Sequence, residues 1–365
     1  MLLSKKIGVV ESFISSNEDI DDIRVNINGK IEKAYNYKKI SGNLNIGDEV
    51  LLNTTAVELS LGTGGYHFVI ANLNNLESNF TEDGHIMKLR YTPLQIKVNS
   101  VEEQDSIYHK KINEFKSLEN LPVVVGGLHS MLTPFVSSYK KDNMNKNVIY
   151  IMTEGASLFL PLSKTVEELK EKKLIDNTIT IGNSFGGDFE CINIYTALIT
   201  AKEILNADVV FISMGPGIAG TGTKYGFTGI EQGYILDSVK KLGGQPIFIP
   251  RISFEDKRER HNGISHHSIT ILDEIVNTKV DVIFSNYEKD KLEIIKNQIE
   301  KYSIDKKHNI IYINDNLCEK NLEYFDLKVK TMGRNYKQDK EFFDTASASA
   351  CYVREEFEVC LRNKP

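Results

Sequence analysis

The feature that most constrains this chain is a repeated alternation of short apolar runs and amphipathic segments from residue 122 onward. An alternation of strands and helices is typical of a parallel β-sheet with helices on both faces. We therefore predict a doubly wound, mostly parallel α/β domain over residues 122–365. Its predicted strands are residues 123–125, 148–152, 178–181, 209–214, 247–249, 280–284, 310–313 and 327–329.

Residues 1–100 follow a different pattern, in which short alternating runs such as 24–27 and 66–70 are separated by turn formers. This spacing predicts a small antiparallel β domain, either a sheet or a barrel. Residues 101–121 carry apolar side chains at loose helical spacing among charges, which predicts a connecting helix. A final helix with one apolar stripe is predicted from Phe343, Ala346, Ala350, Val353, Phe357 and Cys360.

Charge and cysteine content exclude several classes of protein. The 44 basic and 50 acidic residues give a net charge of −6, so we expect neither duplex nucleic acid nor a membrane surface as a partner. The four cysteines lack C-x-x-C spacing, and no apolar run approaches the roughly 18 residues of a membrane span. We therefore expect a cytoplasmic protein, and the sequence leaves open whether it forms a homo-oligomer.

The loops that follow the predicted strands form the candidate ligand site. Ligands of open parallel sheets bind beyond the carboxyl ends of the strands, and several of these loops are rich in glycine, histidine and hydroxyl groups. The longest, residues 215–229, begins with a G-x-G-x-x-G pattern. A dinucleotide site is disfavoured because the next helix is delayed to about residue 230 and the following strand ends in Arg251 instead of an acidic residue.

We predict instead a nest of backbone N–H groups that holds a phosphate or carboxylate, assisted by neighbouring side chains. The predicted ligand-binding residues are Gly215, Gly217, Gly220, Thr221, Gly222, Thr223, Lys224, Arg251, Ser265, His267 and Arg334. The expected partner is a small anionic metabolite, phosphorylated or nucleotide-like, and the sequence names no cofactor.

The candidate catalytic residues are His129, Glu154, Asp188 and His266. Histidine and carboxylate side chains at one sheet edge suit general acid–base work. With Glu190 and His267 they also suggest a mixed metal site for a hydrolase, although no H-E-x-x-H spacing is present. A third hypothesis is a nucleophile elbow at Ser184, within G-x-S-x-G.

Several longer motifs carry a resemblance. They are residues 47–57, 62–68, 184–188, 214–217, 220–223 and 263–267. Over nearly the whole chain, the sequence resembles the bacterial family catalogued as domain of unknown function 3866. The resemblance implies no activity, because that family has no established substrate or catalytic residues, and it implies that serine is not required at position 184.

Two classes of function follow from these patterns. The leading hypothesis is an enzyme that acts on an anionic metabolite at the strand-end loops. The alternative is a non-enzymatic sensor or interaction module that uses the same edge of the sheet for binding alone. The two differ in their demands, because an enzyme needs titratable groups that converge on one point whereas a sensor needs only donors and shape.

Overall fold

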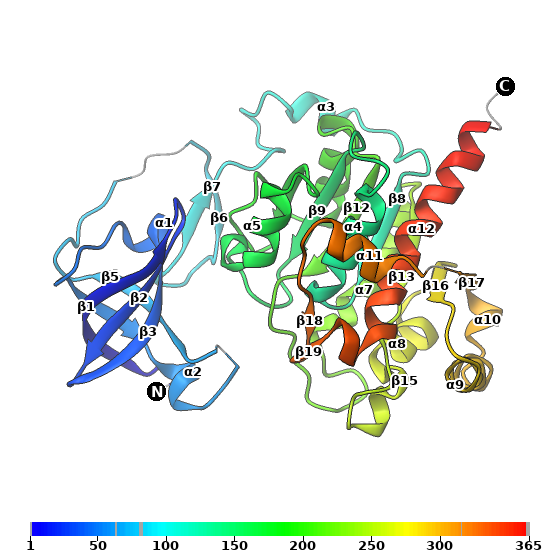
Figure 1. Ribbon diagram of the computed structural model, residues 1–365. Helices are drawn as coiled ribbons and strands as arrows, with labels where there is room; N and C mark the ends of the chain where they lie inside the picture. Colours follow the sequence, from blue (N-terminus) through cyan, green and yellow to red (C-terminus); the bar gives the residue numbers. More distant parts are fainter. Residues whose placement is uncertain (1, 63, 80–82, 315, 363–365) are drawn as a thin grey trace. The chain divides into compact units, whose positions relative to one another are not determined.

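The structure is a computed structural model that describes residues 2–62, 64–79, 83–314 and 316–362, with side chains described as far as residue 354. The chain divides into two compact units, Met1–Val98 and Asn99–Pro365 (Figure 1). Each unit is described by itself.

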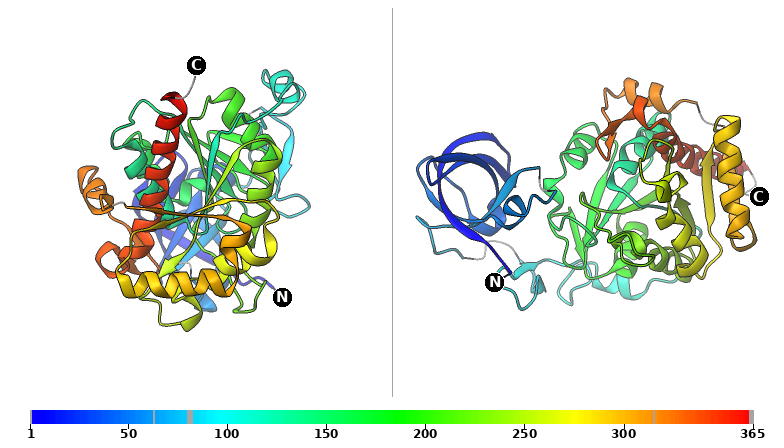
Figure 2. Two further views of the ribbon diagram at one scale, coloured as in Figure 1. Left: turned by 90° about the vertical axis from the view of Figure 1, so that its right-hand side faces the viewer. Right: turned by 90° about the horizontal axis from the view of Figure 1, so that it is seen from below.

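The first unit is a closed β-barrel with the strand order β1-β2-β3-β5-β4 (Figure 2, right). Its strands are β1 (Lys5–Ser16), β2 (Ile20–Ile27), β3 (Lys30–Tyr37), β4 (Glu49–Asn53) and β5 (Tyr66–Asn72). Short helices α1 (Lys38–Ser41) and α2 (Thr55–Glu58) join β3 to β4 and β4 to β5, and β6 (Ile86–Lys88) pairs with β7 (Ile96–Val98) outside the barrel.

The barrel confirms the predicted small β domain, with one difference in strand direction. All pairs of neighbouring barrel strands are antiparallel except β3 and β5, which run parallel. Strand β4 comes between β3 and β5 in the chain and runs antiparallel to β5, so β3 and β5 point in the same direction. Alternate residues such as Ile23, Val25 and Ala34 fill the interior. The arrangement is a five-stranded Greek-key barrel of the OB type.

The second unit is built on an eight-stranded parallel sheet with the order β11-β10-β9-β12-β8-β13-β16-β17. The strands are β8 (Pro122–Gly126), β9 (Val148–Thr153), β10 (Asn177–Ile181), β11 (Phe189–Cys191), β12 (Val209–Met214), β13 (Gln245–Ile249), β16 (Asp281–Ser285) and β17 (Asn309–Ile313). This confirms the predicted doubly wound α/β architecture.

One predicted strand is wrong. Residues 327–329 are not part of the sheet, because they lead into β18 (Lys330–Thr331), which pairs only with β19 (Arg334–Asn335). Leu327 and Val329 are buried in the core, so their apolar character reflects packing and not strand pairing. The eighth strand of the sheet is β11, which is not among the predicted strands.

Helices cover both faces of the sheet (Figures 1 and 2). One hydrophobic core includes residues of α4 (Leu132–Lys140), α5 (Lys164–Glu171), α11 (Cys318–Tyr324) and α12 (Lys340–Arg362). The other includes residues of α6 (Ile194–Ile199), α7 (Glu231–Lys241), α8 (His266–Thr270), α9 (Lys289–Lys301) and α10 (Ile304–Lys307). Helices α6 and α8 each continue as a π-helical turn, at Thr200–Ile204 and Ile271–Ile275.

The predicted final helix is present as α12, and its side chains Phe343, Ala346 and Ala350 are buried in the core that includes α4. The side chains of Phe357 and Cys360 lie outside the described residues. Among the helices of the described ranges, none combines the length and apolar character needed to cross a bilayer.

The connecting helix predicted over residues 101–121 is much shorter in the structure. Only α3 (His109–Asn113) is helical there. The start of the segment is held by the sheet, because the Val101 N–H donates to the Glu190 carbonyl at 2.9 Å. Val101, Ile112 and Leu118 pack on the core, so tertiary contacts and not a continuous helix place the apolar residues.

Candidate functional site

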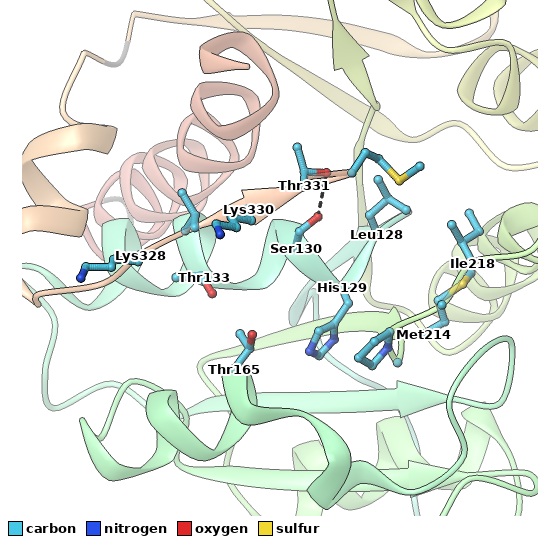
Figure 3. Close-up of a pocket in the computed structure, with 15 residues that line it drawn as sticks. Leu128, His129, Ser130, Thr133, Thr165, Met214, Ile218, Lys328, Lys330 and Thr331 are labelled. Carbon is cyan, nitrogen blue, oxygen red and sulfur yellow. Dashed lines mark hydrogen bonds between the residues drawn. The ribbon is translucent and has the colours of Figure 1, made fainter. Parts of the chain in front are cut away.

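A pocket of about 370 Å³ opens at the carboxyl end of the sheet (Figure 3). Strands β8 and β12 lie side by side there, yet the chain continues from β8 to β9 on one side and from β12 to β13 on the other. Such a reversal is the topological switch point where parallel sheets bind ligands. The lining residues are Leu128, His129, Ser130, Thr133, Thr165, Met214, Gly215, Pro216, Gly217, Ile218, Lys328, Val329, Lys330, Thr331 and Met332.

His129 follows β8 and lies at the centre of the pocket (Figure 3). Its Nδ1 lies 3.1 Å from the Tyr150 hydroxyl, and its Nε2 lies 2.6 Å from the Ser163 hydroxyl. Burial lowers the pKa of His129 to about 4, so the ring is neutral at pH 7. A neutral ring with both nitrogens engaged is held in one orientation.

The two glycines before His129 lie close to neighbouring side chains. A Cβ on Gly126 would lie 2.9 Å from the Phe211 ring, and one on Gly127 would lie 2.6 Å from the Gln232 amide nitrogen. Glycine therefore allows the loop to pass close to β12 and α7 before it turns into α4.

The polar wall of the pocket comes from three other elements. Thr133 stands in the first turn of α4 and Thr165 in the first turn of α5, where the helix dipole favours negative charge. Ser130 donates a hydrogen bond to the Thr331 hydroxyl at 3.1 Å. Lys328 and Lys330 flank the buried Val329, Lys330 being the first residue of β18, and both lysines are exposed.

The long loop after β12 has two parts with different surroundings. Its first part, with Gly215 and Gly217, lines the pocket. A Cβ on Gly215 would lie 2.8 Å from the Ser157 carbonyl oxygen, and Gly217 has a positive φ of 104°. The Ser157 N–H donates to the Pro216 carbonyl at 3.0 Å, which joins this loop to the one after β9.

The second part of the loop folds back on itself. Gly220 and Phe227 form an antiparallel bridge, and the Thr221 N–H donates to the Gly226 carbonyl at 2.8 Å. Lys224 forms an ion pair with Glu274. The predicted residues Gly220, Thr221, Gly222, Thr223 and Lys224 therefore lie in a hairpin and do not line the pocket.

Both predicted arginines are held by acidic partners. Arg251 is buried and forms an ion pair with Asp256 at 2.9 Å. Burial lowers the pKa of Arg251 to about 10, so it remains charged at pH 7. Arg334 donates from Nε to Asp339 at 2.8 Å. Neither side chain lines the pocket.

The histidine pair after β13 belongs to a separate cluster. The rings of His261, His266 and His267 have centroids 4.2–5.2 Å apart, and Ser265 caps α8 while its hydroxyl lies 2.7 Å from His261 Nδ1. Burial lowers the pKa of His261 and of His267 to about 3, and it lowers the pKa of His266 as well. His267 and Arg251 border a second cavity of only about 10 Å³.

The predicted carboxylates also lie outside the pocket. Glu154 accepts hydrogen bonds from the backbone and side-chain nitrogens of Asn183 at 2.6 and 2.8 Å. Asp188 accepts from the Thr178 N–H at 2.8 Å and pairs with Lys170 at 2.5 Å. Of the four candidate catalytic residues, His129 alone lines the pocket.

Two further hypotheses were tested by the geometry. Ser184 is fully buried, and its hydroxyl donates to backbone carbonyls, including that of Ile181 at 2.7 Å, so it is not an exposed nucleophile. Within the described ranges, no three histidine, cysteine, aspartate or glutamate side chains are arranged to hold a metal ion.

The sequence analysis did not predict two sets of residues at or near the pocket. Lys328 and Lys330 carry a detectable signal, since they alternate with the buried Leu327 and Val329. Glu231 at the start of α7 gives no such signal: it bonds the Thr153 hydroxyl, and burial followed by the charge of Glu154 raises its pKa to about 7.

The fold and the pocket define a two-unit protein with a β-barrel and a doubly wound α/β unit that carries a candidate small-molecule site. The chain belongs to the family described as "Protein of unknown function (DUF3866)", whose model matches residues 33–350. This match confirms the resemblance seen in the sequence motifs. No curated protein and no solved structure matches the chain.

Proposed function

We propose that this protein binds a small anionic metabolite in the pocket between β8 and β12. The observation that carries the proposal is the charge of the lining, which includes Lys328 and Lys330 but neither aspartate nor glutamate among its described residues. Lysine ammonium groups and the first turns of α4 and α5 favour a phosphate or carboxylate. The volume of about 370 Å³ is within the range of small-molecule sites and suits a phosphorylated or nucleotide-like compound.

His129 supports a binding role more than an acid–base role. A general base works best when its pKa is near the operating pH, whereas the pKa of His129 is about 4. Its ring is anchored through both nitrogens, to Tyr150 and Ser163. A neutral, fixed ring offers an apolar face and a shaped wall to a ligand, without adding charge.

The test is a thermal-shift screen with inorganic phosphate, pyrophosphate, sugar phosphates and mononucleotides. A ligand present at a hundred times its Kd stabilises the native state by about 2.7 kcal/mol, which raises Tm by several degrees. We expect the double variant K328A/K330A to lose affinity by roughly tenfold or more. The matched control is K240A/K241A, which removes two lysines from the last turn of α7. No shift with any anion, or equal shifts in all three proteins, would overturn the proposal.

An enzymatic role is the second proposal, and Glu231 favours it. A carboxyl group with a pKa of about 7 is able to donate and accept protons near neutral pH. Glu231 lies against Gly155, in the same loop as Ser157, which contacts the pocket through Pro216. Each stabilising phosphate compound would be incubated with the wild type and with E231Q and followed by ³¹P NMR. Conversion by the wild type alone supports catalysis, and no conversion by either supports the sensor or interaction module.

A further inference from the structure

The outer face of the barrel carries an ordered array of side chains that the pocket does not explain. In the register of the barrel, Arg24 on β2 is opposite Lys33 on β3, and Lys33 is opposite Tyr66 on β5. The next outward row is Asp22, Tyr35 and Phe68. Because side chains alternate along a strand and their neighbours fill the core, these two rows share the outer surface.

The aromatic residues of this array form a cluster in which one pair of rings is stacked and the others meet at an angle. The rings of Tyr35 and Tyr66 lie parallel, with centroids 4.1 Å apart and an interplanar angle of 9°. Phe68 adjoins Tyr35 at 6.3 Å, and Tyr37 adjoins Phe68 at 5.8 Å. All four side chains are half-buried.

The exposed charge beside the stacked pair of rings is positive. Arg24 and Lys33 are both exposed, and neither has an ion pair within the part of the chain that the structure describes. Like charges directly opposite each other on neighbouring strands destabilise a sheet, so an anion bound between them would relieve this cost. Lys33 Nζ lies 5.3 Å from the centre of the Tyr66 ring. One carboxylate of this face, Asp22, is 3% exposed and accepts a hydrogen bond from the Tyr66 hydroxyl at 3.2 Å, and the exposed Glu11 on β1 accepts one from the Asn26 amide at 3.0 Å.

We propose that this stacking face, defined as Arg24, Lys33, Tyr35, Tyr66 and Phe68, binds single-stranded nucleic acid. Unpaired bases would stack on the rings while Arg24 and Lys33 contact the phosphates. Barrels of the OB type use the face of strands 2 and 3 in this way. A neutral oligosaccharide also stacks on aromatic rings, but it gives no role to the opposed pair Arg24 and Lys33. A duplex hides its bases, which agrees with the expectation that this protein does not bind duplexes.

The test uses the full chain and fluorescein-labelled 12-nucleotide oligo(dT) and oligo(U), with fluorescence anisotropy at 50 mM salt. We expect saturable binding that weakens as salt rises, with a slope of log K against log salt of about −1.4 for two phosphate contacts. The charge reversal R24E/K33E should abolish binding, and Y66A should weaken it at least about fivefold. Y66F keeps the ring and should bind as the wild type does. Lys5 is exposed on β1, which pairs with β2 and β4 and not with β3 or β5, so K5E is the matched control and should retain binding.

Each other outcome counts against the proposal. If the wild type binds neither oligonucleotide, or if R24E/K33E binds as tightly as the wild type, the stacking face is not a nucleic-acid site. Equal affinity for a 12-base-pair duplex or for heparin would indicate attraction to any polyanion and would exclude stacking. If Y66A proves unfolded by circular dichroism, R24E/K33E still decides the outcome, because both of its substitutions lie on the surface. The pocket of the second unit plays no part in these measurements, so this proposal stands or falls separately.

Discussion

Nε2 of His129 lies 2.6 Å from the hydroxyl oxygen of Ser163, which also accepts the N–H of Val166 at 3.1 Å. One hydroxyl group therefore caps α5 and anchors the ring at the centre of the pocket. The opposite nitrogen, Nδ1, lies 3.1 Å from the Tyr150 hydroxyl. The loop after β8 is thereby tied to α5 and to β9.

We expect Ser163→Ala to destabilise the second unit by about 1 kcal/mol, because it removes the N-cap of α5. Thr165 stands two residues later and makes no cap, so Thr165→Ala is the control and should cost much less. Urea unfolding of both variants measures the difference. Equal losses would show that Ser163 is not the cap.

The contribution of His129 to the stability of the fold should depend on pH in a defined direction. Its folded pKa of about 4 is below the unfolded value of 6.5, so the unfolded chain binds a proton first. The stability that depends on neutral His129 is present above pH 6.5 and is lost as pH falls toward 4. His261 and His267 act with the same sign. NMR titration of the histidine ring protons, assigned with His129→Gln, should show His129 neutral at pH 5.5; a pKa of 6 or above would contradict the structure.

Glu231 should have the opposite effect. Its folded pKa of about 7 exceeds the unfolded value of 4.5, so the folded protein holds a proton that the unfolded chain releases. Stability from this group is therefore lost as pH rises from 4.5 to 7. Glu231→Gln mimics the protonated form, and its stability relative to the wild type should increase across this range. The exposed control Glu293→Gln should show no such trend in urea unfolding.

Gly215 should not tolerate a side chain. A Cβ there would lie 2.8 Å from a backbone carbonyl oxygen, which has little freedom to move. Gly215→Ala should therefore destabilise by about 1–3 kcal/mol, the usual cost of overpacking, and should shift the loop that lines the pocket. At Gly229 the nearest atom to a Cβ is 3.4 Å away, so Gly229→Ala should cost less. Comparable losses of Tm in the two variants would argue against a steric role for Gly215.

The sheet was predictable because its strands are compact apolar runs. Parallel strands that are buried on both faces have this nearly continuous apolar sequence. The segment 327–329 shows the limit of that signal. Leu327 and Val329 are buried as strand residues would be, but they pair with no strand of the eight-stranded sheet. Apolar character reports burial, and pairing depends on neighbours that are remote in sequence.

The position of the pocket was predictable, but most of its lining was not. Glycine-rich loops indicated the edge of the sheet at which the pocket lies, and Gly215 and Gly217 line that pocket. Thr221 and Lys224 do not, because the loop bonds internally and Lys224 pairs with Glu274. Arg251 likewise forms an ion pair with Asp256. A single sequence shows which side chains suit an anion, but it does not show which of them already have a partner in the same chain.

The most direct test of the proposed pocket is NMR titration of the histidine ring resonances of the full chain with inorganic pyrophosphate at pH 7. The account predicts a saturable shift of the His129 resonance that is abolished in K328A/K330A, while His308, which contacts the Leu272 carbonyl at 2.7 Å and does not line the pocket, stays unchanged. An unmoved His129, or a shift that persists in K328A/K330A, would contradict anion binding in this pocket.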